Sequence, residues 1–273
     1  MGTYRFVTFL SDFGAEGSFV GVCRGVILRI APEVTVVDVT HAIAPQDVRQ
    51  GALVLAQSVP FLPEAVHLAV VDPAVGTHRR AIAVATGSGS VLVGPDNGLL
   101  CFAWDCLGGA ERAVELTNES YRLTPTARTF HGRDLFSPAA AHLALGVALK
   151  DLGRSVDPAS LVRLEEPASR VDGDHVHGEV LLVDHFGNLQ LSVGRAELEI
   201  AGIFMGDQIE LRAGGRTHTA CFCETFSEVA VGDLLVYEDS YRRLAVAVNR
   251  GNASHVLGAV CAESVILARL HHR

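Results

Sequence analysis

The stretch "YRFVTFLSDFGAEGSFVGVCRGVILRIAPEVTVVDVT", residues 4–40, decides the fold class. Residues 4–12 and 34–40 are rich in aromatic and β-branched side chains, which favours strands. Between them, residues 18–32 repeat apolar side chains at the spacing of a helix. A strand, a helix and a strand in this order predict a βαβ unit, in which the two strands lie parallel in one sheet.

The same alternation continues along the first half of the chain. Helices are predicted over residues 47–63 and from residue 134 to Gly146 or Gly153. The further predicted strands are residues 65–72, 81–86 and 90–96. These elements predict an α/β N-terminal domain with a mostly parallel sheet, residues 1–165, and such sheets bind ligands at the carboxyl ends of their strands.

The pattern changes in the second half of the chain. A linker without regular structure is predicted at about residues 160–175, where Pro167 and Gly173 lie among mixed charges. Short apolar runs separated by turn residues follow, and no long helical pattern interrupts them. Strands at this spacing predict an all-β C-terminal domain, residues 172–273, built as a small antiparallel barrel or sandwich.

The composition excludes several classes of partner. The net charge is −9 and the acidic residues are scattered, so the basic surface of a nucleic-acid-binding protein is not expected. The apolar runs are far shorter than the roughly 20 residues that cross a bilayer, and the first residues do not resemble a signal peptide. We therefore expect a cytoplasmic protein without a nucleic-acid or membrane partner. Cys221 and Cys223 stand without a second pair, so no metal site is expected.

Four apolar runs end abruptly in polar clusters. The clusters contain Asp12; Asp72 with Arg79 and Arg80; His131 with Asp134; and Asp184, Phe186 and Asn188. A carboxylate at the carboxyl end of a strand can accept hydrogen bonds from a ribose diol, but each cluster also fits a helix cap or a turn. The motifs GxGxxG, GxxxxGK[ST] and GxSxG do not occur, so no dinucleotide, P-loop or hydrolase-elbow site is indicated.

Six motifs occur in a fixed order along nearly the whole chain. They are "SDFG", "VVDPAVGTHRR", "GPDNGLL", "HGRDLFSPAAAHLA", "VDHFGN" and "DSYRRLAVAVNRGNA". In these motifs the sequence resembles the S-adenosylmethionine hydroxide adenosyltransferase family, which is related to the fluorinase and chlorinase enzymes. The resemblance implies an α/β domain followed by a β-barrel domain, and a homotrimer with sites at subunit interfaces. It implies S-adenosylmethionine as the substrate, with no metal and no organic cofactor.

The resemblance also implies roles for individual residues. The family is similar in carrying an Asp, Arg, His triad, which falls here on Asp72, Arg79 and His131, with Arg80 as the alternative arginine. The halogenating relatives carry an aromatic residue in place of Asp72, so this acid implies water as the nucleophile. Either Asp72 or His131 could be the base. The substrate-binding residues that the resemblance implies are Asp12, Asp184, Phe186, Asn188, Phe226, Ser240, Val248 and Arg250.

The sequence departs from the family pattern in three motifs, at four residues. Gly17 stands where relatives carry an Asp that would pair with the methionine ammonium, and Glu16 is a possible substitute. Ala74 replaces a glycine, and Leu191 and Ser192 replace a Thr-Asn pair. The change at residues 191 and 192 bears on the contacts of the methionine moiety.

The function that follows is hydrolysis of S-adenosylmethionine to adenosine and L-methionine, by in-line attack of an activated water on the ribose C5′. One alternative is a halide adenosyltransferase on the same scaffold. Another is a non-catalytic module that binds S-adenosylmethionine or adenosine. A metal phosphoesterase that uses Asp12, Asp72, Asp134 and His131 is a further alternative.

Overall fold

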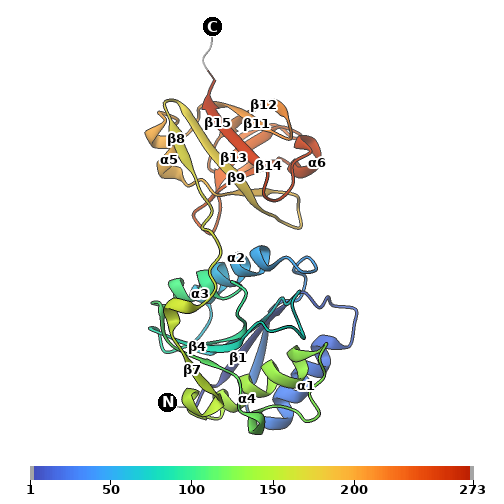
Figure 1. The fold of residues 1–273 in the computed structure, drawn as a ribbon. Coiled ribbons are helices and arrows are strands. Elements are labelled where there is room, and N and C mark those ends of the chain that lie inside the picture. The colour runs from blue at the N-terminus through green and yellow to red at the C-terminus, as the bar shows by residue number, and fades with distance from the viewer. Residues whose placement is uncertain (1–2, 271–273) are drawn as a thin grey trace. The chain divides into compact units, whose positions relative to one another are not determined.

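A computed structural model describes residues 3–270 and separates the chain into two units, with the division between Leu164 and Glu165 (Figure 1). The outermost residues of the two predicted domains, 1–2 and 271–273, lie outside the described part. The stretch around residues 160–175 is not entirely irregular as predicted, because strand β8 (Arg170–Asp172) pairs there with the next strand. Its three residues are too few to show a strand pattern in the sequence.

The N-terminal unit is built on one sheet, whose seven strands within residues 3–164 have the order β2-β1-β3-β5-β4-β6-β7. The strands are β1 (Phe6–Ser11), β2 (Thr35–Thr40), β3 (Val66–Val70), β4 (Ala81–Thr86), β5 (Val91–Pro95), β6 (Ala110–Glu115) and β7 (Arg154–Val156). Strands β2, β1, β3 and β5 run parallel, and β4, β6 and β7 add antiparallel pairs at one side. The predicted α/β class is confirmed.

Helices cover both faces of this sheet (Figure 1). On one face α1 (Phe19–Ile30) packs against α4 (Ser137–Ala144), and on the other α2 (Val48–Ser58) packs against α3 (Cys101–Cys106). The shorter turns of helix are η1 (Val59–Phe61), η2 (Glu119–Tyr121), η3 (Gly132–Phe136), η4 (Leu149–Leu152) and η5 (Pro158–Ser160). Because both faces are covered, the interior strand β3 is buried along its whole length, which explains why four of its five residues, all except His67, are apolar.

The C-terminal unit is a closed β-barrel. Its strands are β8, β9 (His175–Val183), β10 (Leu189–Leu191), β11 (Gln208–Ala213), β12 (Arg216–Phe222), β13 (Leu234–Glu238), β14 (Leu244–Val248) and β15 (Ser264–Arg269). The order β10-β14-β13-β12-β11-β15-β9 closes because β10 also pairs with β9. The predicted all-β barrel is confirmed. Closure leaves no free sheet edge among these seven strands, while β8 pairs with β9 alone, and the inward side chains of the barrel form a single core.

Short helices interrupt the barrel at α5 (Arg195–Ile200), η6 (Phe226–Glu228) and α6 (Ala253–Leu257), which the sequence pattern did not predict. Helix α6 has clear end signals. The Asn252 side chain accepts a hydrogen bond from the His255 N–H at 2.8 Å, and Gly258 ends the helix in the left-handed conformation. Five residues are too few for a helical period to be recognised.

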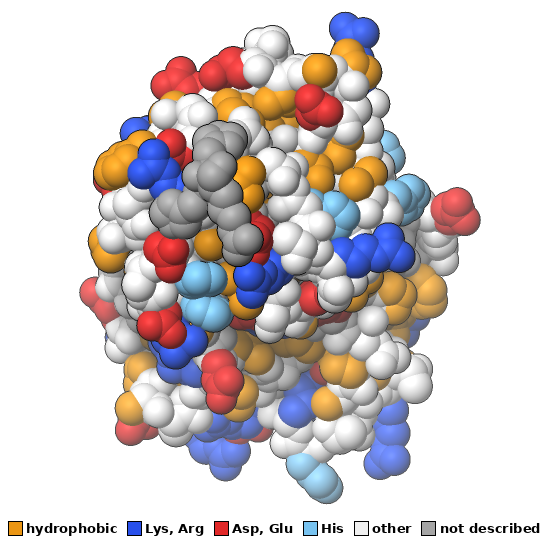
Figure 2. All heavy atoms as spheres, turned by 90° about the horizontal axis from the view of Figure 1, so that it is seen from above, with side chains coloured by type: hydrophobic (Ala, Val, Ile, Leu, Met, Phe, Trp, Pro, Cys, Tyr) orange, Lys and Arg blue, Asp and Glu red, His pale blue; other side chains and the backbone are white. Residues whose placement is uncertain are grey.

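The surface carries mixed charges. On the face shown in Figure 2, acidic and basic side chains of the described residues alternate with apolar and polar ones, without an extended basic patch. This face therefore lacks the electrostatic footprint typical of nucleic-acid binding. No helix in residues 3–270 has the length and apolar character required to cross a membrane.

Candidate active site

Two of the predicted acidic residues lie at the same edge of the sheet. Strands β1 and β3 are parallel neighbours, and Ser11 at the end of β1 is in register with Val70 at the end of β3. Asp12 follows the first strand directly, and Asp72 lies two residues beyond the second. The carboxyl ends of these strands therefore carry both side chains, as expected for a site in an open α/β sheet.

The turn from Asp72 to Arg79 connects the end of β3 to the start of β4. Within it, Val75 N–H donates to the Asp72 carbonyl at 3.3 Å. Gly76 has a φ of +79°, and a Cβ at this position would lie 2.6 Å from the carbonyl oxygen of Arg128. The turn therefore requires glycine here, because it packs directly against the segment that leads to His131.

Arg79 joins an acid and a histidine that are far apart in the sequence. Its Nε lies 2.9 and 3.1 Å from the two carboxylate oxygens of Asp72, and its Nη2 contacts Asp72 Oδ2 as well. The same Nη2 lies 2.7 Å from Nδ1 of His131. The Asp72 and Arg79 side chains are 6% and 8% exposed, and the guanidinium lies over the Phe136 ring. Burial and the two-point contact hold the pair in one orientation.

The contact with Arg79 defines the proton position on His131. A guanidinium only donates hydrogen bonds, so Nδ1 of His131 accepts and the neutral ring carries its proton on Nε2. Burial, together with the adjacent Arg79 cation, lowers the pKa of His131, although the carboxylates of Asp72 and Asp134 partly oppose this. His131 is therefore a neutral hydrogen-bond donor at neutral pH.

A π-helical turn, η3, begins directly after His131. Ser137 Oγ donates to the Gly132 carbonyl at 2.7 Å, and the buried Asp134 accepts from Ala127 N–H at 2.7 Å and from Arg133. Burial acts to raise the pKa of Asp134, but the hydrogen bonds from Arg133 and the Ala127 N–H outweigh it and lower that pKa. Asp134 thus fixes the loop before His131. Such π-turns are frequent at functional sites.

Arg80 points to a different partner from Arg79. Its Nε donates to Asp96 Oδ2 at 2.7 Å, and its Nη1 donates to Ser160 Oγ at 3.1 Å. Arg79 is therefore the arginine that contacts Asp72.

In the part of the chain that the structure describes, no group of three or more His, Cys, Asp or Glu side chains is arranged to hold a metal ion.

Asp12 and the strand end before it are held by a network that the sequence pattern does not indicate. Its Oδ2 accepts from the Gln46 N–H at 2.9 Å. The preceding residue, the fully buried Ser11, lies with its Oγ 2.7 Å from Nδ1 of His41. Nε2 of His41 is in turn 3.3 Å from Asp38 Oδ1. The sequence does show His41 directly after a predicted strand, in "VTVVDVTH". It does not show that this histidine contacts the end of the neighbouring strand at Ser11.

The barrel unit contains a cavity of about 410 Å³. It is lined by Phe186, Asn188, Phe226, Val248, Arg250 and Gly251. Five of the predicted substrate-binding residues therefore meet around one cavity. The Phe186 and Phe226 side chains are 73% and 39% exposed, and exposed aromatic rings beside a cavity can stack on a planar ligand.

The remaining predicted residues of the barrel unit lie outside this lining. Both carboxylate oxygens of Asp184 are used within its turn, where they accept from Phe186 N–H and from the main-chain and side-chain N–H groups of Asn188. Asp184 therefore shapes the cavity rim. Ser240 lies in the turn between β13 and β14, at the opposite end of that hairpin from Val248.

Two of the departures from the family pattern also lie away from the cavity. Leu191 is fully buried in the barrel core. Ser192 Oγ donates to the Ala168 carbonyl at 2.8 Å and accepts from Glu179 N–H at 3.0 Å. Both residues therefore serve packing within the barrel.

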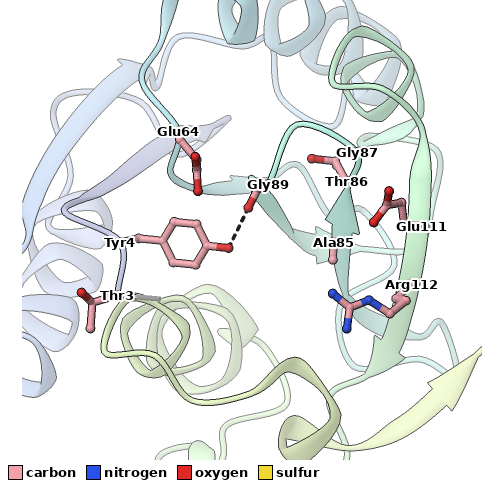
Figure 3. A pocket seen from close by; sticks show the side chains of 9 residues that line it. All are labelled: Thr3, Tyr4, Glu64, Ala85, Thr86, Gly87, Gly89, Glu111 and Arg112. Atoms are coloured by element: carbon pink, nitrogen blue, oxygen red, sulfur yellow. Dashed lines mark hydrogen bonds between the residues drawn. The ribbon is translucent and has the colours of Figure 1, made fainter. Parts of the chain in front are cut away.

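A second cavity, of about 300 Å³, lies in the α/β unit at the opposite end of the sheet from Asp72 (Figure 3). Glu64, which precedes β3, and Thr86, at the end of the antiparallel β4, belong to its lining. Tyr4 also lines it, and the Tyr4 hydroxyl donates to the Gly89 carbonyl at 2.7 Å. This cavity is separate from the cluster of Asp72, Arg79 and His131.

The fold and the site together define a class of protein in which an α/β unit carries a buried Asp-Arg-His cluster at its strand ends and precedes a β-barrel unit. The chain belongs to the SAM hydroxide adenosyltransferase family. The model of the family's N-terminal domain matches residues 7–153, and the model of its C-terminal domain matches residues 178–266. The resemblance seen in the six motifs is thereby confirmed.

Known proteins resemble the chain over most of its length. A relative from Salinispora tropica named (R)-S-adenosyl-L-methionine hydrolase is 51% identical, with 94% of this chain and 95% of the relative covered. A protein of the same name from Thermus thermophilus is 45% identical, with 93% and 96% covered. A fluorinase from Actinoplanes sp. is 33% identical, with 89% and 90% covered. A crystal structure of an uncharacterized conserved protein from Thermotoga maritima has a TM-score of 0.90 at 35% identity, covering 96% of this chain and all of that one.

Proposed function

We propose that this protein hydrolyses S-adenosylmethionine to adenosine and L-methionine. The observation that carries the proposal is the buried arrangement of Asp72, Arg79 and His131 at the carboxyl edge of the sheet. The relatives named (R)-S-adenosyl-L-methionine hydrolase, at 45–51% identity, support the same reaction. Because these relatives are named for the (R) form of the sulfonium, we propose that form as the substrate here too.

In the proposed reaction a water oxygen attacks the ribose C5′ in line with the sulfonium. The new bond is O–C5′, the bond that breaks is C5′–S, and its electron pair stays on sulfur. Methionine leaves as a neutral thioether, so the leaving group needs no proton. The enzyme therefore acts mainly on the nucleophile, which must be positioned and must lose one proton; positioning and proton removal can each supply several powers of ten in rate.

We assign the base role to Asp72. A base needs a free lone pair, and Nδ1 of His131 already accepts from Arg79 while Nε2 carries the proton. The carboxylate of Asp72 keeps lone pairs beyond those that meet Arg79, because two carboxylate oxygens offer about four acceptor sites. His131 is then available to orient the water through its Nε2–H, and Arg79 fixes both neighbours.

The residues proposed to bind the substrate come from both units. In residues 1–165, the proposed catalytic domain, the carboxylate of Asp12 accepts hydrogen bonds from the ribose hydroxyls. In residues 172–273, the proposed barrel domain, the cavity that Phe186 and Phe226 help to line takes the adenine ring by stacking. The further contacts proposed from the family resemblance are Asp184, Asn188, Ser240, Val248 and Arg250.

A homotrimer is the proposed assembly, and the cytoplasm is the proposed location; both rest on the resemblance and the sequence. Size-exclusion chromatography with light scattering tests the first. A monomer at working concentration would contradict it.

Product analysis tests the proposed reaction. Purified protein is incubated with S-adenosylmethionine in the presence and absence of EDTA and of fluoride or chloride, and the nucleosides are separated by chromatography. Adenosine and methionine in equal amounts under every condition are expected. A 5′-halogenated nucleoside would instead indicate halide transfer, tight binding without turnover would indicate a binding module, and loss of activity with EDTA would indicate metal-dependent chemistry.

A further inference from the structure

Two adjacent residues in the "GPDNGLL" motif have no part in the reaction as proposed, yet both contact the strand ends that carry the reacting groups. Asn97 Nδ2 donates to the Val71 carbonyl at 2.9 Å. Asp96 accepts from Arg80 Nε at 2.7 Å, and its own N–H donates to the Arg80 carbonyl at 3.0 Å. Val71 directly precedes Asp72 and Arg80 directly follows Arg79, so the motif holds both ends of the turn from residue 72 to 79.

The main chain is held differently at the two ends of the turn. The pairing of β3 with β5 ends at Leu68 and Val93, so the Val71 carbonyl lies beyond this ladder and receives its hydrogen bond from the Asn97 side chain. On the other side, Ala81 pairs with Pro95, and the bond from Asp96 N–H to Arg80 continues that antiparallel ladder by one step.

Asp96 and Asn97 are themselves firmly placed. The Asp96 side chain is 2% exposed, and its second oxygen accepts from the Val162 N–H at 2.9 Å. Asn97 Oδ1 accepts from the Leu99 N–H at 3.1 Å, which fixes which way its amide points. Buried charge-assisted hydrogen bonds with full sets of partners hold one geometry. The two residues therefore form a rigid frame that contacts both ends of the turn.

We infer that Asp96 and Asn97 are positioning residues, which set the placement of the Asp72–Arg79 pair relative to the attacking water. The inference rests on the proposed function. A displacement of about 1 Å at a reacting group can cost roughly 100-fold in rate. Asp96 and Asn97 reach the pair only through Val71 and Arg80, so their loss affects the placement of the base more than the affinity for substrate. The expected signature is a lower kcat with a nearly unchanged KM.

The test compares Asn97→Ala and Asp96→Asn with the wild type in steady-state kinetics on S-adenosylmethionine. Asn97→Ala removes the bond to Val71, and Asp96→Asn keeps the side-chain shape but removes the charge that meets Arg80. We expect kcat to fall by about 10- to 100-fold in each variant, with KM within about threefold of the wild-type value. Calorimetric titration with S-adenosylmethionine counts the folded, binding-competent fraction, to which kcat is normalised.

Asp105→Asn is the matched control, because Asp105 also pairs with an arginine, Arg163 at 2.6 Å, but both side chains are about half exposed. Its kcat should equal that of the wild type. If the wild type releases adenosine and both Asp96→Asn and Asn97→Ala retain normal kcat per binding-competent molecule, the positioning role is wrong. A rise in KM with unchanged kcat would also overturn it. If the wild type releases no adenosine, the proposed function itself fails. Should Asn97→Ala not fold, Asp96→Asn alone decides the outcome.

Discussion

The guanidinium of Arg79 donates hydrogen bonds both to Nδ1 of His131, at 2.7 Å, and to the carboxylate of Asp72. This single side chain therefore fixes the protonation pattern of the histidine and the orientation of the acid. It favours Asp72 over His131 as the base in the proposed hydrolysis, a choice that the residue types alone leave open.

Replacing Asp72 with Asn should abolish turnover while substrate still binds. The amide keeps the size of the side chain but cannot take a proton from water, and it leaves Arg79 without its anionic partner. We expect kcat to fall by at least about 1,000-fold and the affinity for S-adenosylmethionine to change by less than about fivefold. Adenosine formation and calorimetric titration measure the two quantities. Turnover close to that of the wild type would remove Asp72 from the mechanism.

His131 should be neutral and carry its proton on Nε2 in the free enzyme at pH 7. Nitrogen-15 NMR of labelled histidine side chains distinguishes the two neutral forms and the imidazolium. Because the pKa of His131 is lowered, the neutral ring should persist as the pH falls through the ordinary histidine range, about 6.5. Arg79→Gln removes one cause of this lowering, so the ring should protonate at higher pH in that variant. An Nδ1–H form in the wild type would contradict the assignment.

Loosening the network behind Asp12 should weaken substrate binding more than catalysis. His41→Leu removes the ring that contacts Ser11 and Asp38, so the strand end that carries Asp12 loses its support. We expect KM to rise about tenfold with kcat within about threefold, because a ribose contact is made before and during attack. His175→Leu, at a partly exposed histidine that contacts Asp174, is the matched control and should leave both values unchanged. A normal KM in His41→Leu would show that the network does not support binding.

His67 should make folding sensitive to acid. The ring is fully buried in β3, with Nδ1 2.9 Å from Thr8 Oγ1 and no hydrogen-bond partner for Nε2 among the described residues. Burial lowers the pKa of His67 to about 4. His67 therefore binds a proton below about pH 6.5 in the unfolded chain, but only below about pH 4 in the folded chain. The free energy of unfolding falls across this window as the pH is lowered.

The loss from His67 amounts to about 3 kcal/mol between pH 7 and pH 4, from 2.5 pKa units at 1.36 kcal/mol each. Urea unfolding at a series of pH values measures it. His67→Gln has no group that titrates here, so its stability should change less over this range. Equal pH dependence in both proteins would show that other groups control the acid sensitivity.

The sequence predicted the main elements and most of the strand-end residues, because their signals are local. The apolar periods of β1, α1 and β3 indicate the parallel sheet, and Asp72 stands visibly at the end of one such run. The contacts of the site are not local. Arg79 and His131 are 52 residues apart, and only the fold shows that Arg79, and not Arg80, contacts Asp72.

The shortest helices and strands could also not be predicted from the sequence pattern. The three-residue β7 and β8, and the five-residue α6, are shorter than the periods by which strands and helices are recognised. Asn97 illustrates a further limit. Its motif was visible, but its bond to Val71 depends on where the pairing of two strands stops.

Hydrolysis in water labelled with oxygen-18 tests the central claim most directly. Attack of water on C5′ with loss of the thioether places the label in the 5′-hydroxyl of adenosine and none in methionine. Mass spectrometry of both products from a single incubation gives the answer. We predict one labelled oxygen per adenosine formed, and adenosine without label, or label in methionine, would contradict the account.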